Sequence, residues 1–179
     1  FYEKQNIEVK TSTPVTEINP QNSTIRIDDR EDLPFEHLLI ATGSRVRKIN
    51  VSGSELNNIH YLRTIEDVDQ IRSGMAKDKK LVIVGGGYIG LEVAAIATQA
   101  GMRVRVLETE DRVLQRVTTP TMSNYYTRLH EKRGVRIHTK TRVIGFEGKS
   151  AVERVVCDKD VFDADLVIVG IGIIPNSEL

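Results

Sequence analysis

The sequence predicts an α/β fold built on a parallel sheet. Strands and helices alternate from Lys80 onward, and a glycine-rich turn joins the first of these strands to the next helix. Hydrophobic residues make up 40% of the chain, but no apolar run approaches the roughly 20 residues of a membrane span. The chain of 179 residues is long enough for one good core, or for one domain with parts of a neighbour.

Residues 1–43 are predicted to be β-rich. Val, Ile and Thr recur between turn-forming residues, which is typical of short strands, and Asn19, Pro20 and Asn22 indicate a turn. The strands are expected at 7–10, 14–19, 24–28 and 37–43. The polar stretch that follows, 46–58, fits neither the strand nor the helix period, so a domain boundary is expected near Gly43.

The alternating elements begin with a helix after Thr64, whose hydroxyl can cap it. The apolar, β-branched run 80–84 predicts a strand covered on both faces. Helices are then expected at 88–101 and from Pro120 to Gly134, with strands at 103–108 and 135–139. The segments 142–148, 151–158 and 164–170 predict a β-meander followed by a return strand.

Three glycines follow the strand at 80–84 in the pattern G-x-G-x-x-G. In a strand–turn–helix unit, Gly85 permits the tight turn, Gly87 lets the backbone approach a pyrophosphate, and Gly90 lets helix and strand pack closely. The helix that follows presents free N–H groups and a positive dipole end to phosphates. The alternative is that the glycines serve only the turn.

An acidic residue at the end of the next strand makes the motif more specific. Glu108 lies where a dinucleotide-binding fold has the carboxylate that accepts from a ribose hydroxyl. A glutamate there repels a 2′-phosphate, so we expect a preference for NADH over NADPH. The nearby cations Arg103, Arg105 and Arg112 act against that preference. The sequence therefore predicts a Rossmann-like domain with a three-layer βαβ core and a β-meander.

Composition excludes several other classes of function. Lys plus Arg equals Asp plus Glu at 25 each, so no overall field attracts nucleic acid or an anionic membrane. The single cysteine, Cys157, excludes an intrachain disulfide and a CxxC pair. The histidines show no metal-ligand spacing and are expected at the surface or at caps: His37, His60, His130 and His138. No metal site is expected, and we expect a soluble, cytoplasmic protein.

Three long stretches resemble one family. Residues 82–95 (VIVGGGYIGLEVAA), 112–135 (RVLQRVTTPTMSNYYTRLHEKRGV) and 165–179 (DLVIVGIGIIPNSEL) are similar to FAD-dependent pyridine nucleotide-disulphide oxidoreductases of the ferredoxin, rubredoxin and putidaredoxin reductase type. The resemblance implies that 1–43 is a β-rich part of the FAD domain, 44–168 the NAD(H)-binding domain, and 169–179 the return into the FAD domain. The first residue is not methionine, and the family's first FAD motif is absent, so we expect a piece of a longer protein.

The resemblance also assigns residues. It implies that Glu92 orients the nicotinamide, although an acid in the first helical turn is favoured by the dipole anyway. The other residues that it implies for NADH are Gly85, Gly87, Ile89, Gly90, Glu108 and Gly172. Those that it implies for FAD are Ala41, Thr42, Gly43 and Arg63, of which Arg63 on its own pattern would pass for a solvated side chain.

The function implied is that of the NADH-binding portion of a flavoprotein reductase. Hydride would pass from NADH to FAD, and electrons onward to a small iron–sulfur protein such as a ferredoxin or rubredoxin. No catalytic side chain is expected, because the flavin carries the chemistry, and this chain alone is expected to be inactive. A homodimer is possible, and neither nucleic acid nor membrane is an expected partner.

Two alternatives have the same architecture. One is the NADH-oxidising part of a nitrite reductase, or an NADH oxidase whose active cysteine would lie upstream. The other is a redox-responsive interaction protein similar to apoptosis-inducing factor, against which the zero net charge argues mildly. The stretches 112–120 and 129–135 favour the ferredoxin-reductase type.

Overall fold

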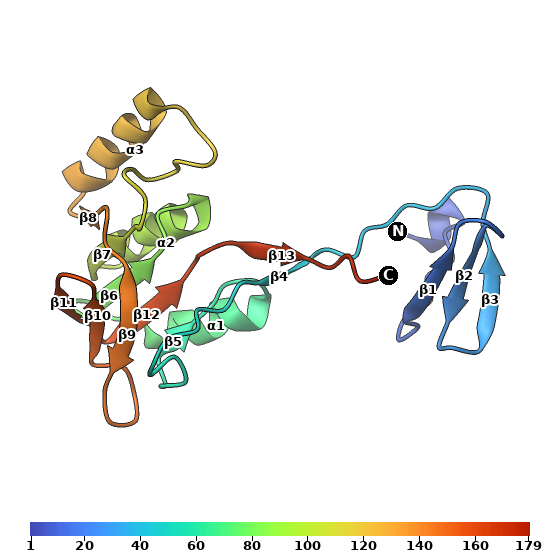
Figure 1. Ribbon diagram of the computed structural model, residues 1–179, viewed down its shortest axis with the longest axis horizontal. Coiled ribbons are helices and arrows are strands. Elements are labelled where there is room, and N and C mark those ends of the chain that lie inside the picture. Colours follow the sequence, from blue (N-terminus) through green and yellow to red (C-terminus); the bar gives the residue numbers. More distant parts are fainter. The chain divides into compact units, whose positions relative to one another are not determined.

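The computed structural model describes residues 1–179, which form two compact units (Figure 1). Unit 1 consists of Phe1–Gly43 and Pro175–Leu179, and unit 2 of Ser44–Ile174. The chain re-enters unit 1 at Pro175, after β13 (Ile173–Pro175) has paired with β4 (Ser44–Val46).

Unit 1 holds a small antiparallel sheet with strand order β1-β2-β3. After a short 3₁₀ helix, Glu3–Gln5, its strands are β1 (Val15–Asn19), β2 (Thr24–Ile27) and β3 (Glu31–Pro34). On the central strand, Arg26 forms ion pairs with Glu17 and Asp32 of the two neighbouring strands. Ile27 is the one side chain of this unit that is buried, so the sheet has almost no core of its own.

Two of the strands expected in this region are present and two are not. The strands expected at 14–19 and 24–28 are confirmed as β1 and β2, whereas 7–10 and 37–43 contain no strand. Leu39 and Ile40 are 89% and 59% exposed. An apolar segment becomes a strand only where another strand pairs with its backbone, and these two segments have no such neighbour in the chain.

Unit 2 is built on a five-stranded sheet with the order β5-β12-β6-β7-β8, in which every neighbouring pair is parallel. Its strands are β5 (Ile59–His60), β6 (Lys80–Val84), β7 (Arg103–Leu107), β8 (Arg136–His138) and β12 (Leu166–Val169). The chain leaves β6 toward β7 and β8, while β12 returns on the other side of β6. The strand order therefore reverses at β6, where open α/β sheets bind ligands. The predicted α/β class is confirmed.

Three helices accompany the sheet: α1 (Ile65–Gly74), α2 (Tyr88–Gln99) and α3 (Pro120–Lys132). Thr64 caps α1 in a reciprocal capping box with Asp67, as its residue type predicts. Thr119 accepts a hydrogen bond from the backbone of α3, which begins at Pro120. Pro is favoured there because its missing N–H would have no helical partner. None of the helices is long and apolar enough to cross a membrane.

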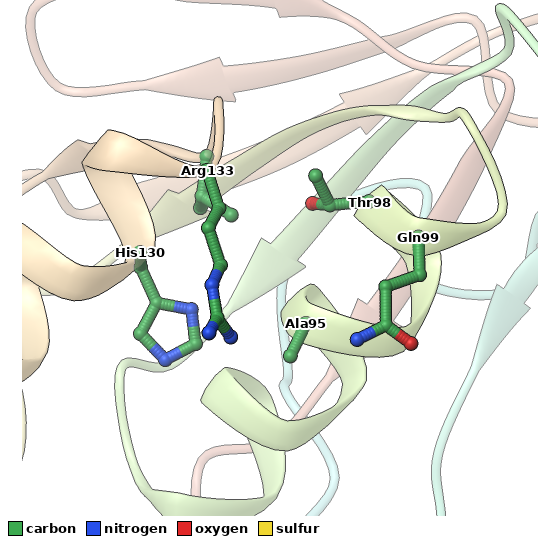
Figure 2. Close-up of a pocket in the computed structure, with 6 residues that line it drawn as sticks. Ala95, Thr98, Gln99, His130 and Arg133 are labelled. Atoms are coloured by element: carbon green, nitrogen blue, oxygen red, sulfur yellow. The ribbon is translucent and has the colours of Figure 1, made fainter.

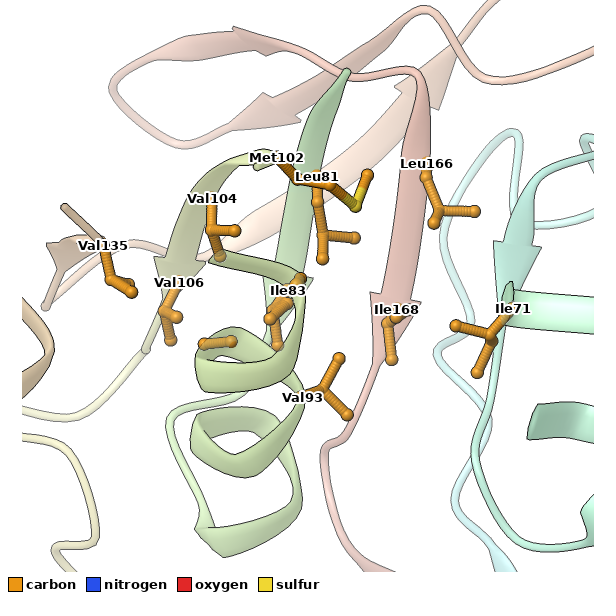
Figure 3. Packing of buried hydrophobic residues seen from close by; sticks show 12 residues of the cluster. Ile71, Leu81, Ile83, Val93, Met102, Val104, Val106, Val135, Leu166 and Ile168 are labelled. Carbon is orange, nitrogen blue, oxygen red and sulfur yellow. The ribbon is translucent and has the colours of Figure 1, made fainter. Parts of the chain in front are cut away.

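Alternate side chains of the sheet enter two separate cores. Leu81, Ile83, Val104 and Ile168 pack on the helical side with α2, as Figure 3 shows. The intervening residues Val82, Val84, Leu107, Val167 and Val169 pack on the opposite side. That side is covered by an antiparallel meander of β9 (Val143–Glu147), β10 (Arg154–Cys157) and β11 (Val161–Asp163). Strands buried on both faces explain the continuous apolar runs in the sequence.

Candidate dinucleotide-binding site

The glycine motif lies at the carboxyl end of β6. Gly85 has a φ of +109°, and a Cβ there would lie 2.3 Å from the carbonyl oxygen of Gly170, just after β12. Only glycine fits this turn, because both the backbone conformation and the close approach exclude a side chain. The turn therefore brings the start of α2 against the segment that follows β12.

The other two motif glycines differ in what surrounds them. A Cβ on Gly90 would lie 2.2 Å from the carbonyl oxygen of Gly85, so this glycine lets α2 pack closely on the turn. A Cβ on Gly87 would meet nothing within 4 Å, and the backbone there is extended, with φ −79°. Packing thus explains Gly90 but not Gly87. Gly87 leaves an open space at the end of the helix, of the kind that a ligand's phosphates occupy.

The first turn of α2 is uncapped. Gly87 is the N-cap residue and no side chain accepts from the helix N–H groups, unlike at α1 and α3. Tyr88 and Ile89 are 51% and 43% exposed beside it. Free N–H groups and the positive end of the helix dipole together attract an anion. The residues present therefore fit the pyrophosphate of a dinucleotide.

Glu108 follows β7 and is hydrogen-bonded to the glycine turn. Its Oε2 accepts the N–H of Gly86 at 2.7 Å, and its Oε1 accepts the N–H of Glu110 at 2.9 Å and the hydroxyl of Thr109 at 3.2 Å. These bonds fix the carboxylate beside the turn. A carboxylate oxygen has more than one acceptor position, so Glu108 can still accept from a ribose hydroxyl.

The three arginines near Glu108 in the sequence all have other partners. Arg103 pairs with Asp78, and Arg105 lies over the ring of Phe162, with its guanidinium carbon 5.7 Å from the ring centroid. Arg112 donates to the carbonyls of Thr118 and Gln115 and to the hydroxyl of Ser123. None of the three guanidiniums is thus directed to a 2′-phosphate beside Glu108.

Two further expected NADH residues lie near the motif in the fold. Glu92 is exposed and forms no ion pair. Because α2 begins at Tyr88, Glu92 lies beyond the first turn, and the helix dipole explains this acid less well than the sequence suggested. Gly172 has a φ of +109° and open space where a Cβ would be, and its carbonyl accepts the N–H of Arg47 at 3.0 Å.

The residues expected to contact FAD are divided between the two units. In unit 1, Asn176 donates its amide to the carbonyl of Thr42 and its backbone N–H to Gly43, each at 3.0 Å. The hydroxyl of Thr42 donates back to the carbonyl of Asn176. In unit 2, Arg63 donates Nε–H to the carbonyl of Ser44 at 2.9 Å. Ala41 is exposed in the segment before Thr42.

A family model described as pyridine nucleotide-disulphide oxidoreductase matches residues 2–179. The chain belongs to this family. The resemblance derived from the residues is therefore confirmed. Enzymes of this family use FAD and NAD(H) as cofactors.

The relatives to which this chain is similar include two reductases. Putidaredoxin reductase of Pseudomonas putida is 45% identical over 99% of this chain and 44% of its own length. Rubredoxin-NAD(+) reductase of Pseudomonas putida is 36% identical over 100% of this chain and 47% of its own length. A crystal structure of the covalent putidaredoxin reductase–putidaredoxin complex superposes with a TM-score of 0.88 at 45% identity, covering 99% of this chain and 44% of that one. The chain thus spans less than half the length of these relatives.

Two hollows of the chain lie away from its glycine motif. One, of about 300 Å³, lies between α2 and α3 and is lined by Ala95, Thr98, Gln99, His130, Arg133 and Val135 (Figure 2). The other follows the outer face of α3 around Tyr125. Both hollows lie away from the start of α2. The candidate dinucleotide site is instead an open surface at the carboxyl edge of the sheet.

One of the histidines is buried and another is partly buried with a buried ring nitrogen, whereas all four were expected at the surface or at caps. His130 is only 8% exposed, and burial, then the charge of Arg133, lower its pKa. His138 lies against Phe162 with a buried Nε2 that has no hydrogen-bond partner. Burial on a mixed helix face or a short strand is not visible in spacing alone. No group of three or more His, Cys, Asp or Glu residues is arranged to hold a metal ion.

One residue of the site was missed by the sequence reasoning. Gly86, the middle glycine of GGG, is hydrogen-bonded on both sides, by Glu108 and by Leu114. A Cβ on Gly86 would lie 2.9 Å from Cγ1 of Val113 and 3.0 Å from Oε2 of Glu108. The run of three glycines was the signal that could have identified it, since G-x-G-x-x-G does not require the middle one.

Proposed function

We propose that this chain is the NADH-binding portion of a flavoprotein reductase that transfers hydride from NADH to FAD and then electrons to a small iron–sulfur protein of the ferredoxin or rubredoxin type. The observation that carries the proposal is the open, uncapped start of α2 at Gly87, beside the carboxylate of Glu108. The identity to putidaredoxin reductase and rubredoxin-NAD(+) reductase supports the acceptor class.

The residues divide into three groups in this proposal. Gly85, Gly87, Ile89 and Gly90 bind the pyrophosphate of NADH, while Glu108 accepts from the adenosine ribose. Glu92 and Gly172 lie at the nicotinamide end. Ala41, Thr42, Gly43 and Arg63 contribute to the FAD side, with 1–43 and 169–179 as parts of the FAD domain and 44–168 as the NAD(H)-binding domain.

Hydride transfer from NADH to FAD requires that the two cofactors be correctly positioned, and not acid or base catalysis. When bound, FAD accepts the hydride and allows electrons to leave one at a time. The chain's part is to hold the dinucleotide through backbone N–H groups and to select NADH through the negative charge of Glu108. The proposal gives Cys157 no part in the chemistry: the residue is buried, and burial, followed by the charges of Asp158 and Asp160, raises the pKa of its thiol to about 11.

Calorimetric titration of the chain with NADH, NADPH and FAD tests the nucleotide assignment. We expect weak binding of NADH, weaker binding of NADPH and hardly any binding of FAD. An absence of NADH binding, or tighter binding of NADPH, contradicts the proposal. Reading the gene outward from both ends tests the flavin assignment, for which an upstream G-x-G-x-x-G motif and a downstream FAD motif are expected.

The alternative functions receive no specific support. Water-forming NADH oxidase structures are 20% identical to this chain, which shows a shared fold only. A homodimer and a cytoplasmic location remain predictions from the sequence.

A further inference from the structure

Residues 108–118, between β7 and α3, form a segment that we call the strap. It holds Gly86 from two sides. Glu108, at the start of the strap, accepts the N–H of Gly86 at 2.7 Å, and Leu114, in its middle, donates its N–H to the carbonyl of Gly86 at 2.9 Å. Both polar groups of the glycine's backbone are therefore fixed by residues more than twenty positions away in the sequence.

Leu114 adopts a backbone conformation that leucine seldom takes. Its φ is +57°, in the left-handed region where the Cβ crowds the carbonyl oxygen. Its side chain is buried with Leu91 of α2 and Val113, and its carbonyl accepts the N–H groups of Val117 and Thr118, each at 3.1 Å. A strained conformation persists only where its surroundings enforce it.

Arg112 is the side chain that joins the parts of the strap to each other and to α3. Its Nη1 donates to the carbonyl of Thr118 at 3.0 Å and to the hydroxyl of Ser123, and its Nη2 donates to the carbonyl of Gln115 at 3.1 Å. Ser123 is completely buried and donates to the carbonyl of Val113 at 2.6 Å. The guanidinium thus bonds to three neutral oxygens that follow Leu114 in the chain, and not to a carboxylate.

We propose that Arg112 is a positioning residue for dinucleotide binding. By closing the strap, it holds Leu114 in its strained conformation. Leu114 and Glu108 in turn hold Gly86, and with it the turn that leads to the free N–H groups of α2. Arg112 itself touches no cofactor. The inference rests on the proposed function only for the identity of the ligand, since the strap and its contacts belong to this chain.

The test compares Arg112→Ala with Arg116→Ala. Arg116 lies in the same strap, but its side chain is 79% exposed and pairs only with Glu110, so it is the matched control. Amide hydrogen exchange is followed by NMR in the full chain, and NADH affinity by calorimetry. We expect Arg112→Ala to speed exchange at Gly86 and Leu114 about ten-fold, and to raise the Kd for NADH about ten-fold, while Arg116→Ala changes neither.

Amides of β6 separate a positioning role from a merely structural one. Val82 and Ile83 are buried in the middle of the sheet, and we expect their exchange to be unchanged in Arg112→Ala. Equal acceleration at Val82, Ile83, Gly86 and Leu114 would mean general destabilisation and would overturn the inference. So would unchanged exchange at Gly86 and Leu114.

Ser123→Ala provides a second variant if Arg112→Ala does not fold. It removes one partner of Arg112, and we expect the same pattern with a smaller amplitude; no effect on Gly86 and Leu114 would overturn the inference. In a chain that folds with both changes, the effects of Arg112→Ala and Ser123→Ala on the Kd should be less than additive. Failure of the unaltered chain to bind NADH contradicts the proposed function, whereas the exchange pattern still decides the role of Arg112.

Discussion

The carboxylate of Glu108 accepts the backbone N–H of Gly86 at 2.7 Å, although the two residues belong to different strand–loop units. The bond gives Glu108 a structural role in addition to the ribose contact proposed for it. A substitution that removes both carboxylate oxygens, such as alanine, therefore changes both the charge facing the nucleotide and the support of the glycine turn.

Replacing Glu108 by glutamine separates these two roles. The amide oxygen can still accept the N–H of Gly86, but the negative charge and the second acceptor oxygen are lost. We expect NADH affinity to fall about ten-fold and the preference for NADH over NADPH to narrow, because the repulsion of a 2′-phosphate disappears. Titration with both nucleotides measures this. Glu147→Gln, on an exposed meander residue paired with Arg154, is the control; a preference that persists in Glu108→Gln would contradict the role of the charge.

The stability of the chain should decrease in mild acid. Burial is the main cause that lowers the pKa of His60, His130 and His138 below the ordinary 6.5. The unfolded chain therefore binds protons at a pH where the folded chain does not. The stability that comes from keeping these histidines uncharged is fully present above pH 6.5. It is lost as the pH falls through their lowered pKa values. Thermal unfolding between pH 8 and pH 5 measures this loss.

His138→Leu should weaken the dependence on pH. The Nε2 of His138 is buried without a partner, Arg105 and Arg136 disfavour its protonation, and only Asp160 favours it. Leucine cannot titrate, so the drop in Tm between pH 8 and pH 5 should be smaller. His37→Leu, at an exposed position of unit 1, should leave the drop as in the unaltered chain. An unchanged drop in His138→Leu would assign the effect to the other two histidines.

The single cysteine should be inert in the folded chain. Burial, with the nearby charges of Asp158 and Asp160, raises the pKa of the Cys157 thiol to about 11, so almost no thiolate exists at pH 7. A thiol reagent such as dithionitrobenzoate should label the native chain slowly and the denatured chain stoichiometrically. Rapid labelling of the native chain would show that the β9–β11 meander opens readily around β10.

The elements that the sequence predicts well are those whose signals are local. The run 80–84, the glycine spacing and the strand that Glu108 follows each depend on neighbouring residues, and all are found in the structure. Strands that need distant partners were missed: β5 pairs with β12 more than a hundred residues away, and β4 with β13. The opposite error was made at 37–43. Its apolar residues predict a strand, but no strand forms there because the segment has no pairing partner.

The same limit applies to the candidate site. Gly85, Gly87 and Gly90 follow from spacing, because each role is set by the turn between one strand and one helix. The contacts of Gly86 with Leu114, and of Arg112 with Ser123, join segments whose approach depends on the completed fold. A φ of +57° at a leucine has no signature in sequence at all, since leucine normally avoids it.

Alanine at Gly87 and at Gly90 should have opposite consequences. At Gly90 the new methyl group would lie 2.2 Å from the carbonyl oxygen of Gly85 and 3.2 Å from Ile83, so α2 must move away from β6. We expect Gly90→Ala to destabilise the fold by about 1–3 kcal/mol, seen as a lower Tm. At Gly87 the backbone is already extended and the space is empty, so Gly87→Ala should leave the Tm nearly unchanged.

The affinity for NADH tests Gly87→Ala, the variant whose Tm should be nearly unchanged. If the NADH pyrophosphate occupies the space beside Gly87, the methyl group introduced by Gly87→Ala excludes the phosphate from the N–H groups of α2. The Kd for NADH should then rise at least about ten-fold. Gly134→Ala is not a suitable control because its φ of +93° adds strain. Gly145→Ala, on β9 of the meander, is a better control, since the atom nearest to its Cβ, the carbonyl oxygen of Ser52, lies at an ordinary contact distance of 3.5 Å. If Gly87→Ala keeps both the Tm and the NADH affinity of the unaltered chain, the pyrophosphate does not bind at this position.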